Sequence, residues 1–252
     1  MDLLFLGTGA ADWKPEDWAR EPHGRYLTAA VLSGQYLIDC GPTLPDAAAF
    51  AGFDLTRVRG VFVTHLHRDH FDREVARRLA DGGAVFYSSP ENAERLAEMG
   101  LPATALPVGE EQTVGGLAVT PIAANHVVAY LTPNRPVHYV FKSEGKTLFW
   151  GCDGCWLTCE SWHLFRRFRY DAVILDGTFG DEKGHEYCFE HNTLRTIEEF
   201  SYVLRGQDLL APGARVFINH MSKNMHTDHD ALVRRVAPFG IEVARDGLRI
   251  SV

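Results

Sequence analysis

Long apolar runs, excess positive charge and cysteine are all scarce in this chain of 252 residues. No apolar run approaches the roughly 20 residues of a membrane span, and the apolar start at Leu3–Leu6 is too short for a signal peptide. The formal net charge of −8 gives no basic footprint, so we do not expect tight electrostatic binding to nucleic acid or an anionic membrane. The five cysteines do not resemble a secreted disulfide framework. We therefore expect a cytoplasmic protein with a small-molecule partner.

Hydrophobic periodicity predicts one α/β domain over residues 1–252. The predicted strands lie at 3–6, 27–32, 36–39, 61–64, 84–87, 117–122, 137–142, 147–150, 172–175, 215–218 and 248–252. The predicted helices lie at 71–79, 92–98, 156–168, 192–204 and 230–237. Hairpin signals come early in each half of the chain and helices come late, which indicates two facing mixed sheets with helices outside. This is a four-layer αββα sandwich.

The segment Thr64–His70 is the most informative part of the sequence, because it places three imidazoles and one carboxylate directly after the apolar run Gly60–Val63. Residues two apart in a strand point the same way, so His65 and His67 can bind one ion. Asp69 and His70 follow where the backbone turns into a helical pattern, which directs them toward a second ion. The segment therefore predicts a two-metal site.

Ligands for two ions must come from more than one loop, and three further candidates follow other predicted strands. His126, Asp153 and His220 each lie just past the end of a strand-like run. The carboxyl ends of strands are where α/β sheets place their sites. Cys152 and Cys155 flank Asp153, but Cys152 should point away from it at a strand end, so we expect both thiols to be bystanders.

The seven candidates divide between two ions. One ion takes His65, His67 and His126, the other takes Asp69, His70 and His220, and Asp153 bridges them. Imidazole and carboxylate ligands suit Zn²⁺ or Mn²⁺, and also Fe²⁺. Two divalent ions, two carboxylates and one hydroxide carry a net charge of about +1, which favours an anionic substrate. Metals also activate water, so hydrolysis is the expected reaction.

Six motifs resemble, in order, the signatures of the metallo-β-lactamase fold. They are Leu6–Gly9, Leu37–Gly41, Thr64–His70, Asn125–His126, Gly151–Asp153 and Asn219–His220. The resemblance spans nearly the whole chain. It implies the αββα sandwich, a dinuclear hydrolase and the seven ligands, with Asp69 also taking part in catalysis.

Further motifs are similar to the phosphodiesterase branch that includes ribonuclease Z and the phosphoribosyl 1,2-cyclic phosphate phosphodiesterase. They are Gly7–Gly9, Asp176–Phe179 and His191–Thr193. In that branch, a histidine at the position of His191 donates a proton to the leaving alkoxide, which suits a poor leaving group. Asp176 would orient His191. The alternatives are a helix-start residue for His191 and a turn cap for Asp176.

Ser222 and Lys223 follow His220 and could hold a phosphate, although Lys223 suits a solvated loop equally well. Two loops without periodicity, at 11–26 and 177–191, are either lids or plain surface loops. The first contains none of the cysteines that hold an accessory zinc in the cyclic phosphate enzyme, so that accessory site should be missing.

Three hypotheses for the function follow. The first is a phosphodiesterase for a small cyclic or nucleotide-like phosphodiester, with metal-bound hydroxide as nucleophile and His191 as general acid. The second is hydrolysis of a carbon ester, thioester or lactone on the same metals, which needs an oxyanion stabiliser more than a leaving-group acid. The third is a non-catalytic ligand-binding domain. The physiological substrate, the native metal and the oligomeric state are not determined by the sequence, which is compatible with a homodimer.

Overall fold

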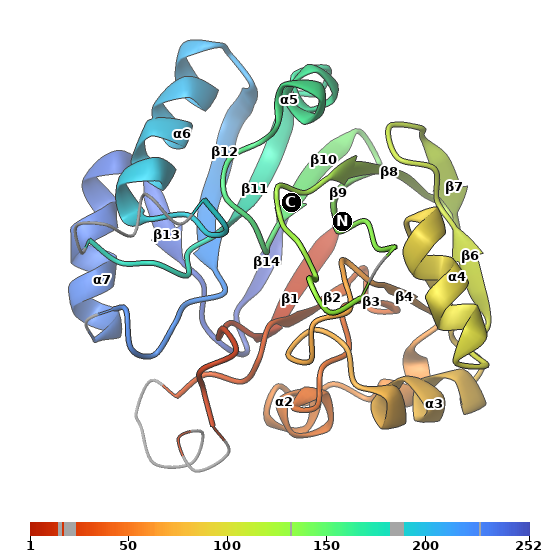
Figure 1. Cartoon of the computed structure of the whole chain (residues 1–252). Coiled ribbons are helices and arrows are strands. Elements are labelled where there is room, and N and C mark those ends of the chain that lie inside the picture. The colour runs from red at the N-terminus through yellow and green to blue at the C-terminus, as the bar shows by residue number, and fades with distance from the viewer. Residues whose placement is uncertain (15–16, 18–23, 132, 182–188, 227) are drawn as a thin grey trace.

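Two seven-stranded sheets form the centre of the protein (Figure 1). This computed structural model describes residues 1–14, 17, 24–131, 133–181, 189–226 and 228–252. In spatial order the first sheet contains β14 (Arg249–Ser251), β1 (Asp2–Gly7), β2 (Ala29–Leu32), β3 (Tyr36–Ile38), β4 (Gly60–Phe62), β5 (Val85–Ser88) and β6 (Ala103–Ala105). The second contains β13 (Ile241–Val243), β12 (Leu210–Asn219), β11 (Tyr170–Asp176), β10 (Lys146–Gly151), β9 (Val137–Ser143), β8 (Leu117–Ala123) and β7 (Gln112–Val114).

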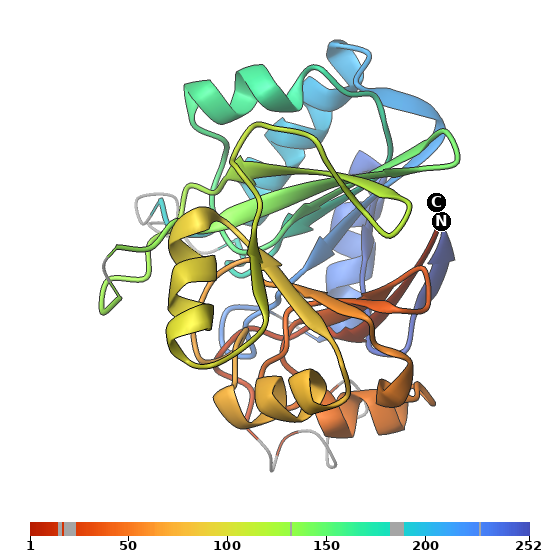
Figure 2. The ribbon, with the colours of Figure 1, turned by 90° about the vertical axis from the view of Figure 1, so that its right-hand side faces the viewer.

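Helices cover the outer face of each sheet, as the two views show (Figure 2). The first sheet is covered by α2 (Leu44–Phe50), α3 (Arg73–Asp81) and α4 (Pro90–Glu98), and the second by α5 (Cys159–Phe165), α6 (Leu194–Gly206) and α7 (His229–Val236). Short 3₁₀ turns lie at η1 (Leu55–Arg57) and η3 (Ala237–Phe239). The order of layers is therefore helix, sheet, sheet, helix.

Strand β1 illustrates why the layers form. Its side chains alternate, so Leu3 and Phe5 join the core between the two sheets, while Leu4 and Leu6 join the core under α2 and α3. All four are almost fully buried. Each such side chain contributes about 1.5–3 kcal/mol of transfer free energy, and both faces of the strand are therefore fixed by burial. The predicted αββα sandwich is confirmed.

Each sheet is antiparallel in one part and parallel in the other. In the first sheet, β3 to β6 run parallel, while β14, β1, β2 and β3 pair antiparallel. In the second, β10 to β13 run parallel and β7 to β10 antiparallel. The carboxyl ends of β4, β10, β11 and β12 all lead into the loops that carry the candidate site residues.

Helix boundaries differ from the predictions by a few residues, and caps explain two of the differences. The Asp72 carboxylate accepts hydrogen bonds from the backbone of Glu74 and Val75, both at 2.9 Å, so α3 begins at Arg73 and not at position 71. Thr158 caps α5 in the same way, and Trp156 before it has a φ of 46°. The helix predicted at 156–168 is therefore only Cys159–Phe165.

Four elements were not predicted: α2, β6, β7 and β13. The three strands have three residues each, too few for a clear alternation.

In the described part of the chain, no helix has the length and apolarity to cross a bilayer, and four free cysteines are present. The loops at 11–26 and 177–191 were expected to be lids or plain surface loops. Residues 15–16, 18–23 and 182–188 of these loops lie outside the described residues.

Candidate metal centre

The seven candidate ligands lie at strand ends, as predicted. The segment that starts at His65 follows β4 after two residues, and Asp153 follows β10 after one. His126 follows β8 and His220 follows β12 directly. The facing sheets bring these loops together at one edge of the sandwich. The side chains form two groups of four in which every ligand atom lies within 4.8 Å of the others.

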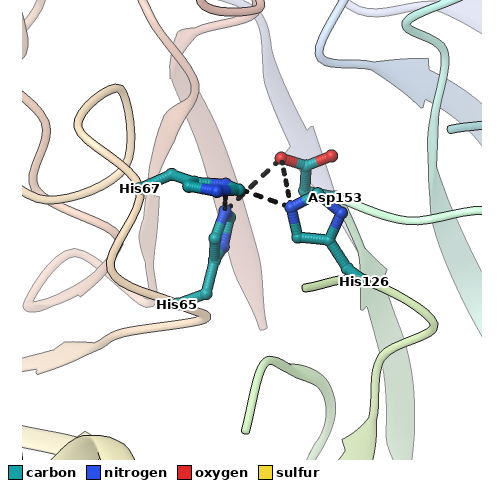
Figure 3. Close-up of side chains that lie close together, drawn as sticks. All are labelled: His65, His67, His126 and Asp153. Atoms are coloured by element: carbon teal, nitrogen blue, oxygen red, sulfur yellow. Dashed lines mark hydrogen bonds and ion pairs between the residues drawn. The ribbon is translucent and has the colours of Figure 1, made fainter. Parts of the chain in front are cut away.

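The first group contains His65, His67, His126 and Asp153 (Figure 3). His67 Nδ1 lies 2.9 Å from His65 Nε2 and 3.0 Å from His126 Nε2. Asp153 Oδ2 lies 3.4 Å from His65 Nε2 and 3.6 Å from His126 Nε2. Three imidazole nitrogens and one carboxylate oxygen thus converge on one point, as the geometry of a metal site requires.

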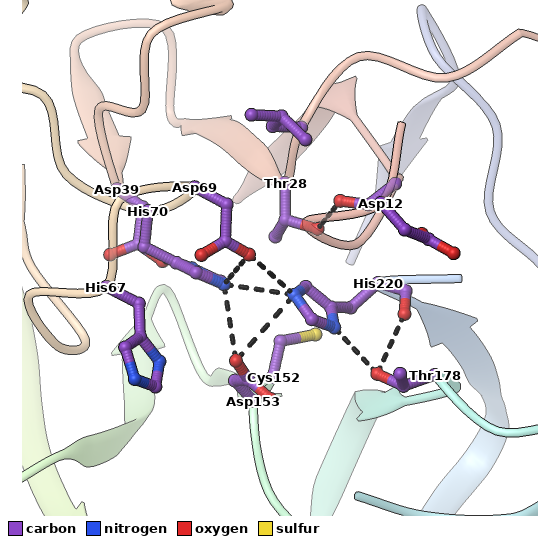
Figure 4. A network of polar contacts seen from close by, with 12 residues as sticks. Asp12, Thr28, Asp39, His67, Asp69, His70, Cys152, Asp153, Thr178 and His220 are labelled. Atoms are coloured by element: carbon purple, nitrogen blue, oxygen red, sulfur yellow. Dashed lines mark hydrogen bonds and ion pairs between the residues drawn. The ribbon is translucent and has the colours of Figure 1, made fainter. Parts of the chain in front are cut away.

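The second group contains Asp69, His70, Asp153 and His220 (Figure 4). His70 Nε2 lies 3.1 Å from His220 Nε2, and Asp69 Oδ2 lies 3.3 Å from His220 Nε2 and 3.4 Å from His70 Nε2. Asp153 Oδ2 lies 3.5 Å from His70 Nε2 and 3.7 Å from His220 Nε2. The same Asp153 oxygen therefore belongs to both groups.

Proton positions at His70 and His220 test whether a metal fits. Asp39 Oδ2 only accepts, so the His70 Nδ1–H donates to it at 2.8 Å and the ring turns its Nε2 toward His220. Thr178 Oγ1 donates to the His220 carbonyl oxygen at 3.0 Å and so accepts from His220 Nδ1 at 2.7 Å. Against the opposing effect of burial, the carboxylates of Asp69 and Asp39 raise the pKa of His70 well above its usual value, so a proton lies between the two Nε2 atoms, which are 3.1 Å apart. A divalent metal can take the place of that proton, because both Nε2 atoms and the carboxylates of Asp69 and Asp153 converge on one point, and the residues therefore fit such an ion.

Asp39 orients ligands in both groups. Besides His70, it accepts hydrogen bonds from the Thr64 backbone at 2.8 Å and from Thr64 Oγ1 at 2.8 Å to Oδ2. Because the Thr64 hydroxyl donates to Asp39, it accepts from His65 Nδ1 at 2.9 Å and leaves His65 Nε2 free to bind a metal. The carboxylate is fully buried. Sequence reasoning missed this role, although Asp39 lies within the motif Leu37–Gly41.

The electrostatics of the centre suit metal ligands. Burial and the neighbouring imidazole of His70 hold the pKa of His65 well below its usual value, so His65 is neutral. Burial alone would favour the neutral acid at Asp153, but the imidazoles of His220 and His191 hold the pKa of that carboxyl well below its usual value. The carboxylate that the two groups share is therefore an anion.

Asp176 and His191 lie directly beside the two groups. His191 Nδ1 is 2.8 Å from Asp176 Oδ2 and 2.7 Å from Asp153 Oδ1. Asp176 is fully buried and also accepts from Gly154 N at 3.0 Å and Thr178 N at 2.9 Å. Against the opposing effect of burial, the two carboxylates raise the pKa of His191 to about 11. Asp176 thus both caps a turn and holds the imidazole.

A cavity of about 840 Å³ opens onto the centre. His191 and several metal-ligand candidates line one part of it. The remaining wall is largely apolar and includes Val127, Tyr130, Phe179 and Met225, with charged residues Asp12, Arg68 and Glu190. The volume suits a small organic molecule.

Ser222 and Lys223 are engaged by acidic residues. Ser222 Oγ lines the cavity but donates to Asp12 Oδ2 at 2.6 Å, and Lys223 N donates to Asp12 Oδ1 at 3.0 Å. The Lys223 ammonium pairs with Asp17.

Cys152 is buried in the core between the sheets. Neither Cys152 nor Cys155 belongs to a candidate metal group among the described residues.

The αββα layers and the convergent His and Asp side chains define the class of protein. A family model described as a beta-lactamase superfamily domain matches residues 35–211, and the chain belongs to this family. The structure of Zn²⁺-bound PqqB from Methylobacterium extorquens superposes with a TM-score of 0.77 at 18% identity, covering 100% of both chains. That likeness confirms the fold.

Two curated relatives match parts of the sequence. Ribonuclease Z of Pseudomonas putida is 36% identical over 70 residues, which are 28% of this chain and 21% of that protein. The zinc phosphodiesterase ELAC protein 1 of Homo sapiens is 36% identical over 74 residues, 28% of this chain and 18% of that protein. The matches span about a fifth of each relative's length. They confirm the resemblance to the ribonuclease Z branch.

Proposed function

We propose that this protein is a metal-dependent phosphodiesterase that acts on a small cyclic or nucleotide-like phosphodiester. The observation that carries the proposal is the Asp176–His191 pair beside Asp153, the carboxylate common to both metal groups. Hydrolysis of a phosphodiester at an alkyl oxygen needs a proton for the leaving group. A histidine fixed next to the metal groups supplies that proton.

Each group of residues has its own part in the proposed reaction. The groups around Asp153 would hold two divalent ions, zinc or manganese, which supply water activation and charge stabilisation at the phosphoryl group. Asp176 holds His191 through Nδ1, so Nε2 is the nitrogen that can reach a substrate in the cavity. His191 then donates its proton to the departing sugar or alkyl oxygen. Asp69 completes the second group and contributes negative charge there.

The names of the relatives support the choice of reaction. One is called a zinc phosphodiesterase and another a ribonuclease, and both names refer to phosphodiester cleavage. The net charge of −8 disfavours tight binding of a long nucleic acid. We therefore infer a small anionic substrate that enters the cavity of about 840 Å³.

Parallel assays test the proposal against its alternatives. The purified protein is stripped with chelator, reloaded with Zn²⁺ or Mn²⁺, and given bis(4-nitrophenyl) phosphate, an alkyl 4-nitrophenyl phosphodiester and an aryl thioester. We expect metal-dependent hydrolysis of the phosphodiesters. Asp153→Asn should abolish it, whereas Asp46→Asn, an exposed acid on α2, should have no effect.

Two results would contradict the proposal. Turnover of the thioester without turnover of either phosphodiester would identify a carbon-ester or thioester hydrolase. Tight metal binding without turnover of any substrate would favour a ligand-binding domain.

A further inference from the structure

An acidic residue of this chain lies in the wall of the cavity. Asp12 lines the cavity, and its carboxylate accepts hydrogen bonds from Ser222 Oγ at 2.6 Å and from the backbone N–H groups of Lys223 and Asn224 at 3.0 and 3.1 Å. Asn224 Nδ2 donates a fourth hydrogen bond at 3.1 Å. Four donors that suit a phosphate thus already bind a carboxylate of this chain.

Lys223 cannot serve as that contact without breaking existing interactions. Its ammonium pairs with Asp17 and lies 5.9 Å from the centroid of the Trp13 ring. Lys223 is also not among the residues that line the cavity. The segment Ser222–Asn224 therefore holds the loop of Asp12 in place, and its donors are occupied although Ser222 lines the cavity.

Arg68 is the sole lysine or arginine among the described residues that line the cavity. It lies between the ligands His67 and Asp69, and its backbone is fixed because the His67 carbonyl accepts from His70 N at 3.1 Å and from Phe71 N at 2.8 Å. The side chain is exposed, and it forms no ion pair within the described part of the chain. The backbone at Arg68 is therefore fixed, while its side chain is exposed to solvent.

We propose that Arg68 binds a non-bridging phosphoryl oxygen of the substrate and is the main protein cation that recognises phosphate in this cavity. The inference rests on the proposed function. A guanidinium offers paired N–H donors that match phosphate oxygens. Apart from His191, which serves as the proton donor, the other charged side chains of the wall outside the metal groups are Asp12 and Glu190, and they carry the opposite charge. They disfavour the same anion elsewhere, so the phosphoryl group should lie on the Arg68 side.

Binding of inorganic phosphate to the metal-loaded protein tests Arg68 without any need for turnover. Isothermal titration calorimetry compares the native protein with Arg68→Gln, Arg68→Lys, Lys223→Gln and Arg73→Gln. Arg73 is a matched control because it is an exposed arginine at the start of α3 that does not line the cavity. Metal content is measured in each preparation, and phosphate is titrated at saturating metal.

We expect Arg68→Gln to raise the phosphate Kd about tenfold, corresponding to one charge-assisted contact. Arg68→Lys should raise it less, and Arg73→Gln should leave it unchanged. An unchanged Kd in Arg68→Gln overturns the inference, and so does a Kd that rises in Lys223→Gln instead. Absence of phosphate binding to the native, metal-loaded protein also overturns it.

The failure of this inference can be told apart from failure of the proposed function. If Arg68 governs phosphate affinity but no phosphodiester is hydrolysed, the anion site stands and the reaction is wrong. If phosphodiesters are hydrolysed and Arg68→Gln changes neither phosphate affinity nor KM, the reaction stands and the assignment of Arg68 is wrong.

Discussion

Asp39 accepts the Nδ1–H of His70 at 2.8 Å, and both side chains are fully buried. The hydrogen bond fixes the ring so that Nε2 points at the metal groups. A carboxylate behind a metal-binding histidine also raises the basicity of the ligand nitrogen. Thr64 connects Asp39 to His65, because its hydroxyl donates to Asp39 and accepts from His65 Nδ1, so the orientation of His65 also depends on Asp39. One buried acid outside the metal groups thus controls two ligands.

Substitution of Asp39 should weaken metal binding although Asp39 belongs to neither group. Asp39→Asn removes the charge and replaces one of the two accepting carboxylate oxygens by an NH₂ group, which donates and cannot accept from Thr64 or His70. We expect metal affinity to fall about 10–100-fold, measured by competition with a chromophoric chelator. Asp46→Asn, an exposed control, should retain native affinity. Equal affinities for the two variants would show that the ligands hold their orientation without Asp39.

Gly41 makes a close approach that a larger residue would disrupt. An added Cβ would lie 2.0 Å from the carbonyl oxygen of Asp69, a candidate ligand. Gly41→Ala should therefore displace Asp69 and reduce bound metal, read by elemental analysis after gel filtration. Gly206→Ala is the control, because nothing lies within 4 Å of its added Cβ. Native metal content in Gly41→Ala would mean that the Asp69 loop adjusts without loss of the ligand.

Loss of His191 should depend on the leaving group. His191→Ala should lower kcat about 10²–10⁴-fold on an alkyl phosphodiester, which needs a proton donor. The loss should be far smaller on a bis(aryl) phosphodiester, because an aryl oxide leaves without a proton. Steady-state kinetics on the two substrates give the comparison. Equal losses on both would remove the acid role and leave His191 as a support for Asp153.

Asp246 should make stability depend on pH. Burial raises the pKa of its carboxyl from 3.8 to about 6, despite hydrogen bonds from Thr8 Oγ1 and Tyr26 N, both at 2.6 Å. The native state then holds the proton more tightly than the unfolded chain. This contribution is fully present below pH 4 and is lost as the pH rises through 6, by up to about 3 kcal/mol.

Urea unfolding at pH 4.5 and 7.5, with chelator present, measures this effect. The free energy of unfolding of Asp246→Asn should fall less between the two pH values than that of the native protein. Asp81→Asn, an exposed acid at the end of α3, should behave as native. An identical pH dependence for native and Asp246→Asn would locate the titration elsewhere.

Much of the site could be predicted because its ligands follow strong strand signals. Hydrophobic runs mark where strands end, and His126, Asp153 and His220 come just after such runs. The structure brings all three to the segment that starts at His65. The positions of the strand ends were sufficient to predict that these residues lie close together, because strand ends in facing sheets meet at one edge.

Asp176 was expected to orient His191, but the supporting roles of Asp39 and Thr178 could not be predicted, because they depend on tertiary contacts. Thr178 and Asp39 accept from ligand histidines 42 and 31 residues away in sequence. No local pattern distinguishes such a threonine or aspartate from a turn residue. For Lys223, the sequence suggested a role that the structure does not support. Its position after His220 suggested a phosphate contact, but the ammonium pairs with Asp17.

The pairing of β1 with β14 joins the two ends of the described chain, so the first sheet cannot form fully before β14 is available. Leu3 lies opposite Ile250, and Thr8, in the loop after β1, donates to Asp246 at 2.6 Å. On the ribosome, the ligands of the segment that starts at His65 emerge long before residues 246–251. Contacts between such distant segments form late. A nascent chain therefore holds most of its ligands in an unfinished sheet until residues 246–251 have emerged and paired with β1.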